Sequence, residues 1–216
     1  MGPARRVIVT RPRPQAGALA DRLEARGHTV VLCPLLEISP LGDDPIDLDG
    51  YDWVVVTSAN GADELARRRR GPLPQVAAIG PGTAEALARY GIEVDFVPLV
   101  STQEGLAAEF PRPPGRVLVA AAEGARRYLA DELGADFVPL YRTVPLRPER
   151  PPDGDLVVLA SASAARAFAA LRLDIPAVSI GPETTRAAEA AGLAVVREAE
   201  QHDLDGLVAA VERAAG

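Results

Sequence analysis

The sequence contains no lysine, because all 23 of its basic residues are arginine. Schiff-base chemistry and the lysine of phosphate-binding loops are therefore excluded. Cys33 is the only cysteine and histidine occurs twice, so neither an internal disulfide nor a zinc cluster of cysteines and histidines is available. Aromatic residues make up only 4% of the chain, and the core must come mainly from Ala, Val, Leu and Ile.

Long apolar runs and an excess of positive charge are also missing. No stretch reaches the eighteen or so apolar residues of a membrane span, and the N-terminus enters a strand without the apolar segment of a signal peptide. The formal net charge of −7 argues against general nucleic-acid binding. We interpret the arginine run at 67–70 as a solvated helix end, where cations suit the helix dipole. The sequence thus predicts a cytoplasmic protein with no nucleic-acid and no membrane partner.

One segment of the sequence occurs as two similar copies. IGPGTAEALARYGIEV begins at Ile79 and IGPETTRAAEAAGLAV at Ile180, with seven of sixteen positions identical at a constant offset of 101 (180 − 79). Each copy is typical of a strand end, a tight Gly-Pro turn and a helix closed by glycine. Backbone N–H groups at a helix start have no intrahelical partner and accept carboxylates or phosphates readily. Two such segments predict an anion-binding cleft built from two halves.

Short apolar segments alternate with helical ones of about ten residues along the rest of the chain. Strands are predicted at residues 7–10, 29–33, 53–58, 75–80, 93–97, 117–120, 136–140, 156–161, 177–181 and 193–196. Helices are predicted at 15–26, 59–69, 102–110, 123–133 and 204–213, and after both Gly-Pro turns. Pro-rich segments near 34–45 and 145–152 are predicted linkers. This pattern predicts an α/β fold with two flavodoxin-like parallel-sheet units covered on both faces.

Ligands of open α/β sheets bind beyond the carboxyl ends of the strands, and the residues expected there are hydroxyls, glycines and an arginine. They are Thr10, Arg11, Thr57, Ser58, Gly80, Thr83, Tyr141, Ser161, Ser163, Gly181 and Thr184. Metal catalysis lacks its ligands in this set. A hydroxyl before a helix also serves as an N-cap, and Tyr141 can equally close a strand with its ring packed down, so both interpretations stay open here. His28 and His202 are predicted to be ordinary surface residues.

Three familiar motifs fail on spacing or partners. The turn Gly80-Pro81-Gly82 lacks the G-x-G-x-x-G spacing of dinucleotide-binding folds. No aspartate ends the strand at 53–58, where receiver-type flavodoxin folds carry a phosphoacceptor. Ser161-Ala162-Ser163 has neither the flanking glycines nor the histidine partner of a nucleophile elbow.

Several motifs, taken in chain order, resemble the uroporphyrinogen-III synthase family over essentially the whole sequence. They are VIVTRP at 7–12, PLLEI at 34–38, VTSANG at 56–61, the two IGPxT turns and LYRT at 140–143. The resemblance implies a lyase without cofactor or metal. Such an enzyme cyclises the linear tetrapyrrole hydroxymethylbilane to uroporphyrinogen III, releasing water and inverting the last pyrrole ring, in tetrapyrrole (haem, sirohaem, cobalamin) biosynthesis.

The resemblance also implies how the chain is divided. Two flavodoxin-like lobes, joined by two linkers, would come from an internal duplication with exchanged halves. One lobe would hold residues 1–35 plus 147–216, and the other residues 38–144, with the linkers near 34–45 and 145–152. The implied partner is the small-molecule substrate. A monomer is expected, and the resemblance leaves room for a transient contact with the preceding pathway enzyme.

The family's substrate contacts map to one pair of residues in each lobe, Ser58 with Thr83 and Ser161 with Thr184, and its catalytic tyrosine maps to Tyr141. We add Thr10, Arg11, Gly80, Ser163 and Gly181 from their predicted place at the sheet edges. The segment AAAEGARRYL at 120–129 departs from the polar or glycine-rich turn of relatives, although Arg126 matches.

Catalysis by such a site would rest on holding a folded conformer of the substrate, with Tyr141 donating a hydrogen bond to the departing hydroxyl from the cleft between the lobes. The alternative is a non-catalytic two-lobed binding module for an anionic small molecule. Identifying which uroporphyrinogen isomer forms from hydroxymethylbilane distinguishes the enzyme from the binding module.

Overall fold

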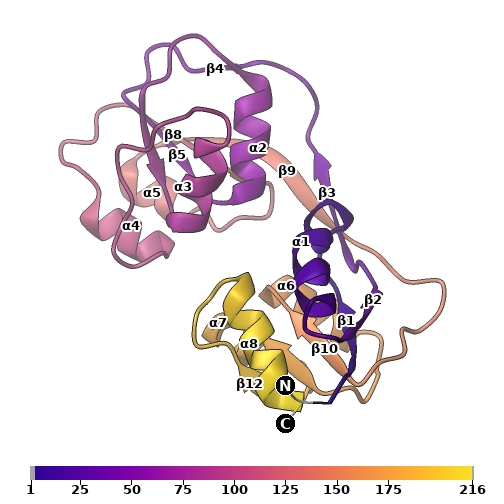
Figure 1. The fold of residues 1–216 in the computed structure, drawn as a ribbon. Coiled ribbons are helices and arrows are strands. Elements are labelled where there is room, and N and C mark those ends of the chain that lie inside the picture. The colour runs from indigo at the N-terminus through magenta and orange to yellow at the C-terminus, as the bar shows by residue number, and fades with distance from the viewer. Residues whose placement is uncertain (1–2, 216) are drawn as a thin grey trace. The chain divides into compact units, whose positions relative to one another are not determined.

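The structure, a computed structural model, describes residues 3–215. The chain divides into two compact units. Unit 1 comprises Met1–Glu37 and Val144–Gly216, and unit 2 comprises Ile38–Thr143. Residues 1, 2 and 216, which the predicted lobe of 1–35 plus 147–216 includes, lie outside the described residues. Each unit is an α/β layer structure built on a parallel sheet, which confirms the predicted fold class at that level (Figure 1).

Unit 1 contains a five-stranded sheet in the order β12-β11-β10-β1-β2, and all neighbouring strands are parallel. Its apolar strands are buried on both faces, as covered parallel sheets require. Helices α1 and α8 supply one half of the core, and α6 and α7 supply the other. The elements are β1 Arg6–Val9, α1 Arg13–Glu24, β2 Thr29–Leu32, β10 Leu156–Leu159, α6 Ala162–Ala169, β11 Ala177–Ser179, α7 Pro182–Ala190, β12 Val195–Glu198 and α8 Leu204–Ala215.

Unit 2 holds the sheet β3-β9-β8-β5-β7, whose pairs from β9 to β7 are parallel. Helices α2 and α3 cover one face and α4 and α5 the other, where the Trp53 and Phe110 rings meet edge-on at 5.1 Å. The elements are β3 Leu36–Pro40, β4 Ile46–Asp47, β5 Trp53–Val56, α2 Ala59–Arg68, β6 Arg69–Arg70, β7 Gln75–Ala78, α3 Pro81–Ala88, α4 Gln103–Glu109, β8 Val117–Ala122, α5 Tyr128–Leu133 and β9 Asp136–Pro145.

The connections between the units contain more strand than the sequence predicts. The segment near 34–45, expected to be a linker, contains β3, and β9 continues five residues past the predicted end at Leu140, to Pro145. These two segments pair with each other at the edge of the sheet, with Leu41 N–H donating to Leu140 O at 2.9 Å. Edge strands tolerate proline, because one side of the strand needs no ladder donor. Tyr141 therefore lies inside a strand and not after one.

Two predicted elements are shortened by local hydrogen bonds. The strand expected at 93–97 is reduced to a single bridge between Ala77 and Phe96. Asp95 Oδ2 accepts from Val76 N–H at 2.7 Å and so takes the place of a backbone ladder acceptor. The helix expected at 123–133 begins only at Tyr128, because Glu123 N–H donates to Tyr141 O at 2.8 Å and prolongs the sheet pairing.

The arginine run at 67–70 is not the purely solvated helix end that the sequence predicts. Arg67 forms ion pairs with Asp43 and Glu64, and Arg68 is buried with its Nε donating to Asp44 O at 2.9 Å. The run therefore fastens the acidic segment at 43–44 to α2.

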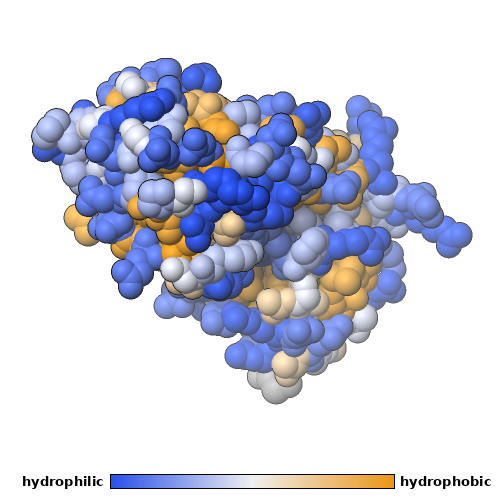
Figure 2. Space-filling model, turned by 90° about the horizontal axis from the view of Figure 1, so that it is seen from above, coloured by the Kyte–Doolittle hydropathy of each residue, from blue (hydrophilic) through white to orange (hydrophobic). Residues whose placement is uncertain are grey.

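Figure 2 shows a face of the molecule that is mostly hydrophilic, with smaller hydrophobic patches between the charged side chains.

Candidate functional site

The structure places most of the predicted site residues where parallel strands end. In unit 2, Ser58 follows β5 and Gly80 follows β7, while Tyr141 pairs with Ala122 at the end of β8. In unit 1, the corresponding positions after β1, β10 and β11 are taken by Arg11, Ser161 and Gly181. Each unit thus has its own cluster of candidate residues at the carboxyl edge of its sheet.

Ser58 and Tyr141, which are 83 residues apart, are in direct contact. Their side-chain oxygens lie 2.9 Å from each other. Ser58 is also the N-cap of α2, and its Oγ accepts from the N–H of Gly61 at 3.0 Å. The Tyr141 ring packs into the apolar cluster beneath α2, and only 6% of the residue is exposed. The ring is packed down, which is one of the two interpretations that the sequence left open.

The geometry of this pair limits where its two protons go. Ser58 Oγ already accepts one N–H and carries a single proton. When Ser58 donates to the Tyr141 oxygen, the phenol proton of Tyr141 is left for another acceptor. When Tyr141 donates to Ser58 Oγ instead, its only hydroxyl proton is used and none is left for another acceptor. Ser58 therefore controls the donor capacity of Tyr141.

The first Gly-Pro turn leads into α3. Gly80 has an extended backbone, with φ −176°, so its φ does not require glycine. A Cβ at this position would lie only 2.8 Å from the Cβ of Ser101, and this close approach is what requires glycine. Pro81 takes the first helical position, where its missing N–H costs little. Thr83 stands in the first turn with 6% of its surface exposed, and its N–H donates to Gly80 O at 3.1 Å.

The second Gly-Pro turn repeats this arrangement at the start of α7. Gly181 is again extended, and a Cβ there would lie 3.1 to 3.3 Å from the ring of His202. Thr184 is buried, with 4% of its surface exposed. The next residue, Thr185, ties the turn to the sheet, because its hydroxyl contacts Ser179 Oγ at 2.6 Å, Gly181 O at 3.2 Å and the Glu198 carboxylate.

Ser161 and Ser163 form a cap at the start of α6. Ser161 Oγ accepts from Ala164 N–H at 3.2 Å and lies 3.0 Å from Ser163 Oγ. The Ser161 backbone, with φ −165° and ψ 157°, matches that of Ser58, with φ −168° and ψ 159°. The capping role that the sequence left open is thus present at both serines. Only Ser58 has a tyrosine hydroxyl as its second contact.

Thr10 and Arg11 follow β1 and behave differently. Thr10 is fully buried, and its hydroxyl donates to Val158 O at 3.0 Å, which joins the ends of β1 and β10. The Arg11 guanidinium is partly buried, and its Nε has no hydrogen-bond partner among the described residues. Burial lowers the pKa of Arg11, because desolvation disfavours the charged form. An arginine nevertheless stays protonated at neutral pH, and Arg11 is a cation that forms no ion pair with a carboxylate of residues 3–215.

The two histidines, both predicted to be surface residues, differ in burial. That prediction is wrong for His28, which is buried and whose Nδ1 accepts from Arg5 N–H at 3.3 Å. His202 is exposed but stands against Gly181. The contacts of Ser101 with Gly80 and of His202 with Gly181 were not predicted from the sequence. The signal was available, because the two residues share the offset of 101 (202 − 101) that relates the turns themselves.

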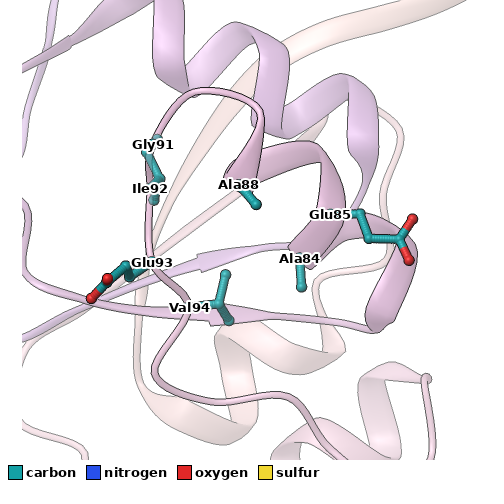
Figure 3. Close-up of a pocket in the computed structure, with 7 residues that line it drawn as sticks. All are labelled: Ala84, Glu85, Ala88, Gly91, Ile92, Glu93 and Val94. Carbon is teal, nitrogen blue, oxygen red and sulfur yellow. The ribbon is translucent and has the colours of Figure 1, made fainter.

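A shallow hollow of about 650 Å³ lies beside α3. Figure 3 shows its lining of Ala84, Glu85, Ala88, Gly91, Ile92, Glu93 and Val94. None of the predicted site residues lines it. Two carboxylates, from Glu85 and Glu93, would repel an anionic ligand, so this hollow is a poor seat for the polycarboxylate that the two turns suit.

Residues 3–215 contain no group of three or more His, Cys, Asp or Glu side chains arranged to hold a metal ion. Within the same residues, no helix has the length and apolarity that crossing a membrane requires.

Known proteins resemble this chain in both sequence and fold. The sequence profile described as "Uroporphyrinogen-III synthase HemD" matches residues 17–209. A uroporphyrinogen-III synthase from Synechococcus elongatus is 27% identical over 96% of this chain and 94% of its own length. A porphyrin biosynthesis protein HemD from Ruminiclostridium josui is 28% identical over 94% of this chain and 47% of its own.

Solved structures share the fold at lower identity. The crystal structure of uroporphyrinogen-III synthetase from Helicobacter pylori superposes with a TM-score of 0.65 at 17% identity, over 95% of this chain and 97% of that one. A mutant uroporphyrinogen III synthase from Thermus thermophilus gives 0.64 at 18% identity over 98% of both chains. Because the profile match covers most of the sequence, the chain belongs to the uroporphyrinogen-III synthase HemD family.

Proposed function

We propose that this chain is a lyase that cyclises hydroxymethylbilane to uroporphyrinogen III, with inversion of the last pyrrole ring and release of water, in tetrapyrrole biosynthesis. Family membership and the sequence relatives support this activity. The observation that carries it in the structure is the pair of Gly-Pro turns, each leading into a helix start with a buried threonine. No comparison supports the alternative of a non-catalytic binding module.

Substrate carboxylates are held at these helix starts and by Arg11. Backbone N–H groups of α3 and α7 donate to them, next to Thr83 and Thr184. Arg11 contributes the strongest single contact, because its partly buried guanidinium has no anionic partner among the described residues and can form charge-assisted hydrogen bonds with the substrate. Thr10 positions Arg11 by joining the ends of β1 and β10. Ser161 and Ser163 add hydroxyl contacts at the start of α6.

The chemical step needs little acid or base strength. The C–O bond of the hydroxymethyl group breaks, the oxygen leaves as water after taking a proton, and an electrophilic azafulvene remains. The substituted α-carbon of the last ring attacks this carbon when the enzyme holds the folded conformer, which is a positioning effect. The bond from the attacking carbon to its original bridge carbon then breaks and leaves a second azafulvene on the neighbouring ring. The unsubstituted α-carbon of the last ring bonds to that bridge carbon, which completes the inversion. Closure finally releases a ring proton, which restores the donor.

Tyr141 supplies the proton to the departing hydroxyl. Ser58 donates to the Tyr141 oxygen in the reactive arrangement, which frees the phenol proton and stabilises the charge that develops as it leaves. The buried position of the ring fixes the direction of the hydroxyl. Ser58, which the sequence suggested as a substrate contact, acts in this proposal by positioning Tyr141.

The fold is proposed to derive from an internal duplication with exchanged halves. Three observations support it: the repeated turn segments, the matched backbone at Ser58 and Ser161, and the strand orders. Numbered within unit 1, the sheet has the flavodoxin order 2-1-3-4-5. Unit 2 gives the same order once β8 is counted as its first strand, with β9, β5, β7 and the bridge at Phe96 following. The chain segments that link the two units are β3 and β9.

The enzyme is further proposed to work as a cytoplasmic monomer that takes its reactive substrate by transient contact with the preceding pathway enzyme. The single cysteine, Cys33, is buried and free, and so requires no oxidising compartment. The hydroxyl residues and the arginine of the candidate site require neither a metal nor a cofactor for the step described.

The test of this proposal is product analysis. Hydroxymethylbilane is mixed with the purified chain, the products are oxidised to uroporphyrins, and isomers I and III are separated by chromatography. Formation of isomer III supports the proposal, and formation of isomer I alone, at the rate of the spontaneous reaction, contradicts it.

A further inference from the structure

The largest exposed aliphatic side chains of unit 2 gather in one short loop. Leu99 is 94% exposed, Val100 is 57% exposed and Val97 is 36% exposed. We call residues 97–100 the apolar loop. It follows the bridge of Phe96 to Ala77, which is parallel, so it emerges at the same sheet edge as the turn that follows β7. Exposed apolar groups at such a point mark a contact surface.

The apolar loop is held in place by several contacts. Leu99 N–H donates to Glu109 Oε2 at 3.1 Å, and Thr102 N–H donates to Val100 O at 2.7 Å. Thr102 also caps α4 by accepting from Gly105 N–H at 3.0 Å. A side chain at Gly105 would collide with Val100 O, so glycine is needed for this close packing. Leu99 is thus presented to solvent by an ordered backbone.

The loop is continuous with the proposed anion site. Ser101, which directly follows it, fills the space that a side chain at Gly80 would need. The apolar loop therefore borders the start of α3, where substrate carboxylates are proposed to bind. Val100 and Leu99 immediately precede this contact in the chain.

A loop of the same construction occurs in unit 1 with opposite chemistry. Residues 198–201, the counterpart loop, precede His202, which packs on Gly181 as Ser101 packs on Gly80. Asp203 accepts from Gly206 N–H at 2.7 Å, as Thr102 does from Gly105 N–H, and a side chain at Gly206 would collide with Gln201 O. Where the apolar loop has Leu99 and Val100, the counterpart loop has Glu200 and Gln201.

We propose that Leu99 and Val100 form a contact surface for a pyrrole ring of the substrate, and that this surface makes the turn of unit 2 chemically distinct from the turn of unit 1. The proposal rests on the proposed function. Hydroxymethylbilane combines carboxylates with flat apolar rings, and the other candidate residues supply only polar contacts. Ligand sites are mostly apolar with a few placed polar groups, and the apolar loop supplies the missing part.

The distinction between the turns has a consequence for the product. A linear tetrapyrrole has two different ends, and the reaction inverts the ring at only one of them. A protein with two similar turns must tell these ends apart. An apolar surface at one turn and a charged, polar one at the other can do so, because one end of the substrate carries a polar hydroxymethyl group and the other end has an unsubstituted ring carbon.

The experiment compares Leu99→Asn and Val100→Thr with the matched control Val196→Thr. Val196 is 47% exposed on β12 and lies outside both loops, so it offers the same Val-to-Thr change at a similarly exposed position. KM and kcat for hydroxymethylbilane and the ratio of isomers III and I are measured for each. We expect Leu99→Asn to raise KM about tenfold, which corresponds to losing about half of the burial of a leucine side chain.

Val100→Thr is expected to raise KM about threefold, and Leu99→Ile to restore a value near that of the wild type. The KM of Val196→Thr should equal that of the wild type. The unfolding midpoints of all variants should also stay unchanged, because the replaced side chains are exposed. An active wild type with KM and isomer ratio unaltered in Leu99→Asn overturns this inference alone. A wild type that forms no isomer III overturns the proposed function, and this inference with it.

Discussion

Replacing Tyr141 with phenylalanine tests the proposed chemical step most sharply, because the change removes a single oxygen. Within the described part of the chain, that oxygen forms a hydrogen bond only with Ser58 Oγ, at 2.9 Å, and Ser58 keeps its bond from Gly61 N–H when the oxygen is removed. The ring stays in its apolar cluster. The free energy of unfolding should therefore fall by about 0.5–1.5 kcal/mol, the usual net value of one hydrogen bond.

The effect on rate should be much larger than the effect on stability. Losing a proton donor used in the transition state typically lowers kcat by about 10- to 1000-fold. Steady-state formation of isomer III by Tyr141→Phe is compared with that by Tyr51→Phe. Tyr51 is the matched control, because its hydroxyl also donates a hydrogen bond, to Asp136 at 2.8 Å, but at the opposite end of the strands.

A double-mutant cycle then separates positioning from a direct role of Ser58. Ser58→Ala should lower kcat and should also lower stability by about 1 kcal/mol, since the cap of α2 is lost. If Ser58 acts through Tyr141, the change adds little further loss of kcat in the Tyr141→Phe background. Turnover of Tyr141→Phe equal to that of the wild type would refute the reasoning and leave Tyr141 as a packing residue.

Four further outcomes are expected. Arg11→Gln should raise KM about 10- to 100-fold through loss of a charge-assisted contact, with Arg11→Lys intermediate; equal KM values in substrate titrations would remove Arg11 from the site. Thr83→Ala and Thr184→Ala should raise KM less than about tenfold, because backbone donors remain; a variant with no activity in steady-state kinetics would contradict this expectation. Gly80→Ala should destabilise the protein by about 1–3 kcal/mol, more than Gly181→Ala, since the exposed His202 ring can shift; urea unfolding in the reverse order would contradict the packing account. Finally, the hydrogen bond from Tyr51 and the contact with Arg116 lower the pKa of Asp136. Their contribution to the free energy of unfolding is therefore present above the unfolded pKa of about 3.9 and is lost as pH falls through and below that value. Between about pH 5 and 3, the unfolding midpoint of Asp136→Asn should fall less than that of the wild type.

Local sequence pattern was sufficient for most of the elements. Short apolar strands such as β5 and β10 are buried on both faces, and the glycines that close the helices stand where the periodicity ends. The pattern failed where a side chain replaced a backbone partner. Asp95 bonds to Val76 N–H and shortens the strand expected at 93–97, which no periodicity reveals.

The linker strands were missed for a different reason. Prolines in the segments 34–45 and 145–152 indicated irregular chain, and they are compatible with β3 and the end of β9 only because these strands pair at a sheet edge. Pairing between segments about one hundred residues apart is a tertiary property. Neither segment alone contains the information.

The candidate site shows the same division. The residue types and their places after strands could be predicted, because carboxyl ends of parallel strands share one edge. The contact between Ser58 and Tyr141 could not, since it depends on how β5 and β9 are ordered in the sheet. Nor could the burial of Thr10, whose hydroxyl bonds to Val158 O across two strands far apart in sequence.

The most direct test of the whole account is the isomer ratio formed from hydroxymethylbilane as the amount of wild-type protein increases, in the presence of a metal chelator. The account predicts that uroporphyrinogen III rises with protein until it is nearly the sole product, while the chelator changes nothing. Isomer I at every protein concentration, or isomer III that disappears with the chelator and returns with added metal, would contradict it.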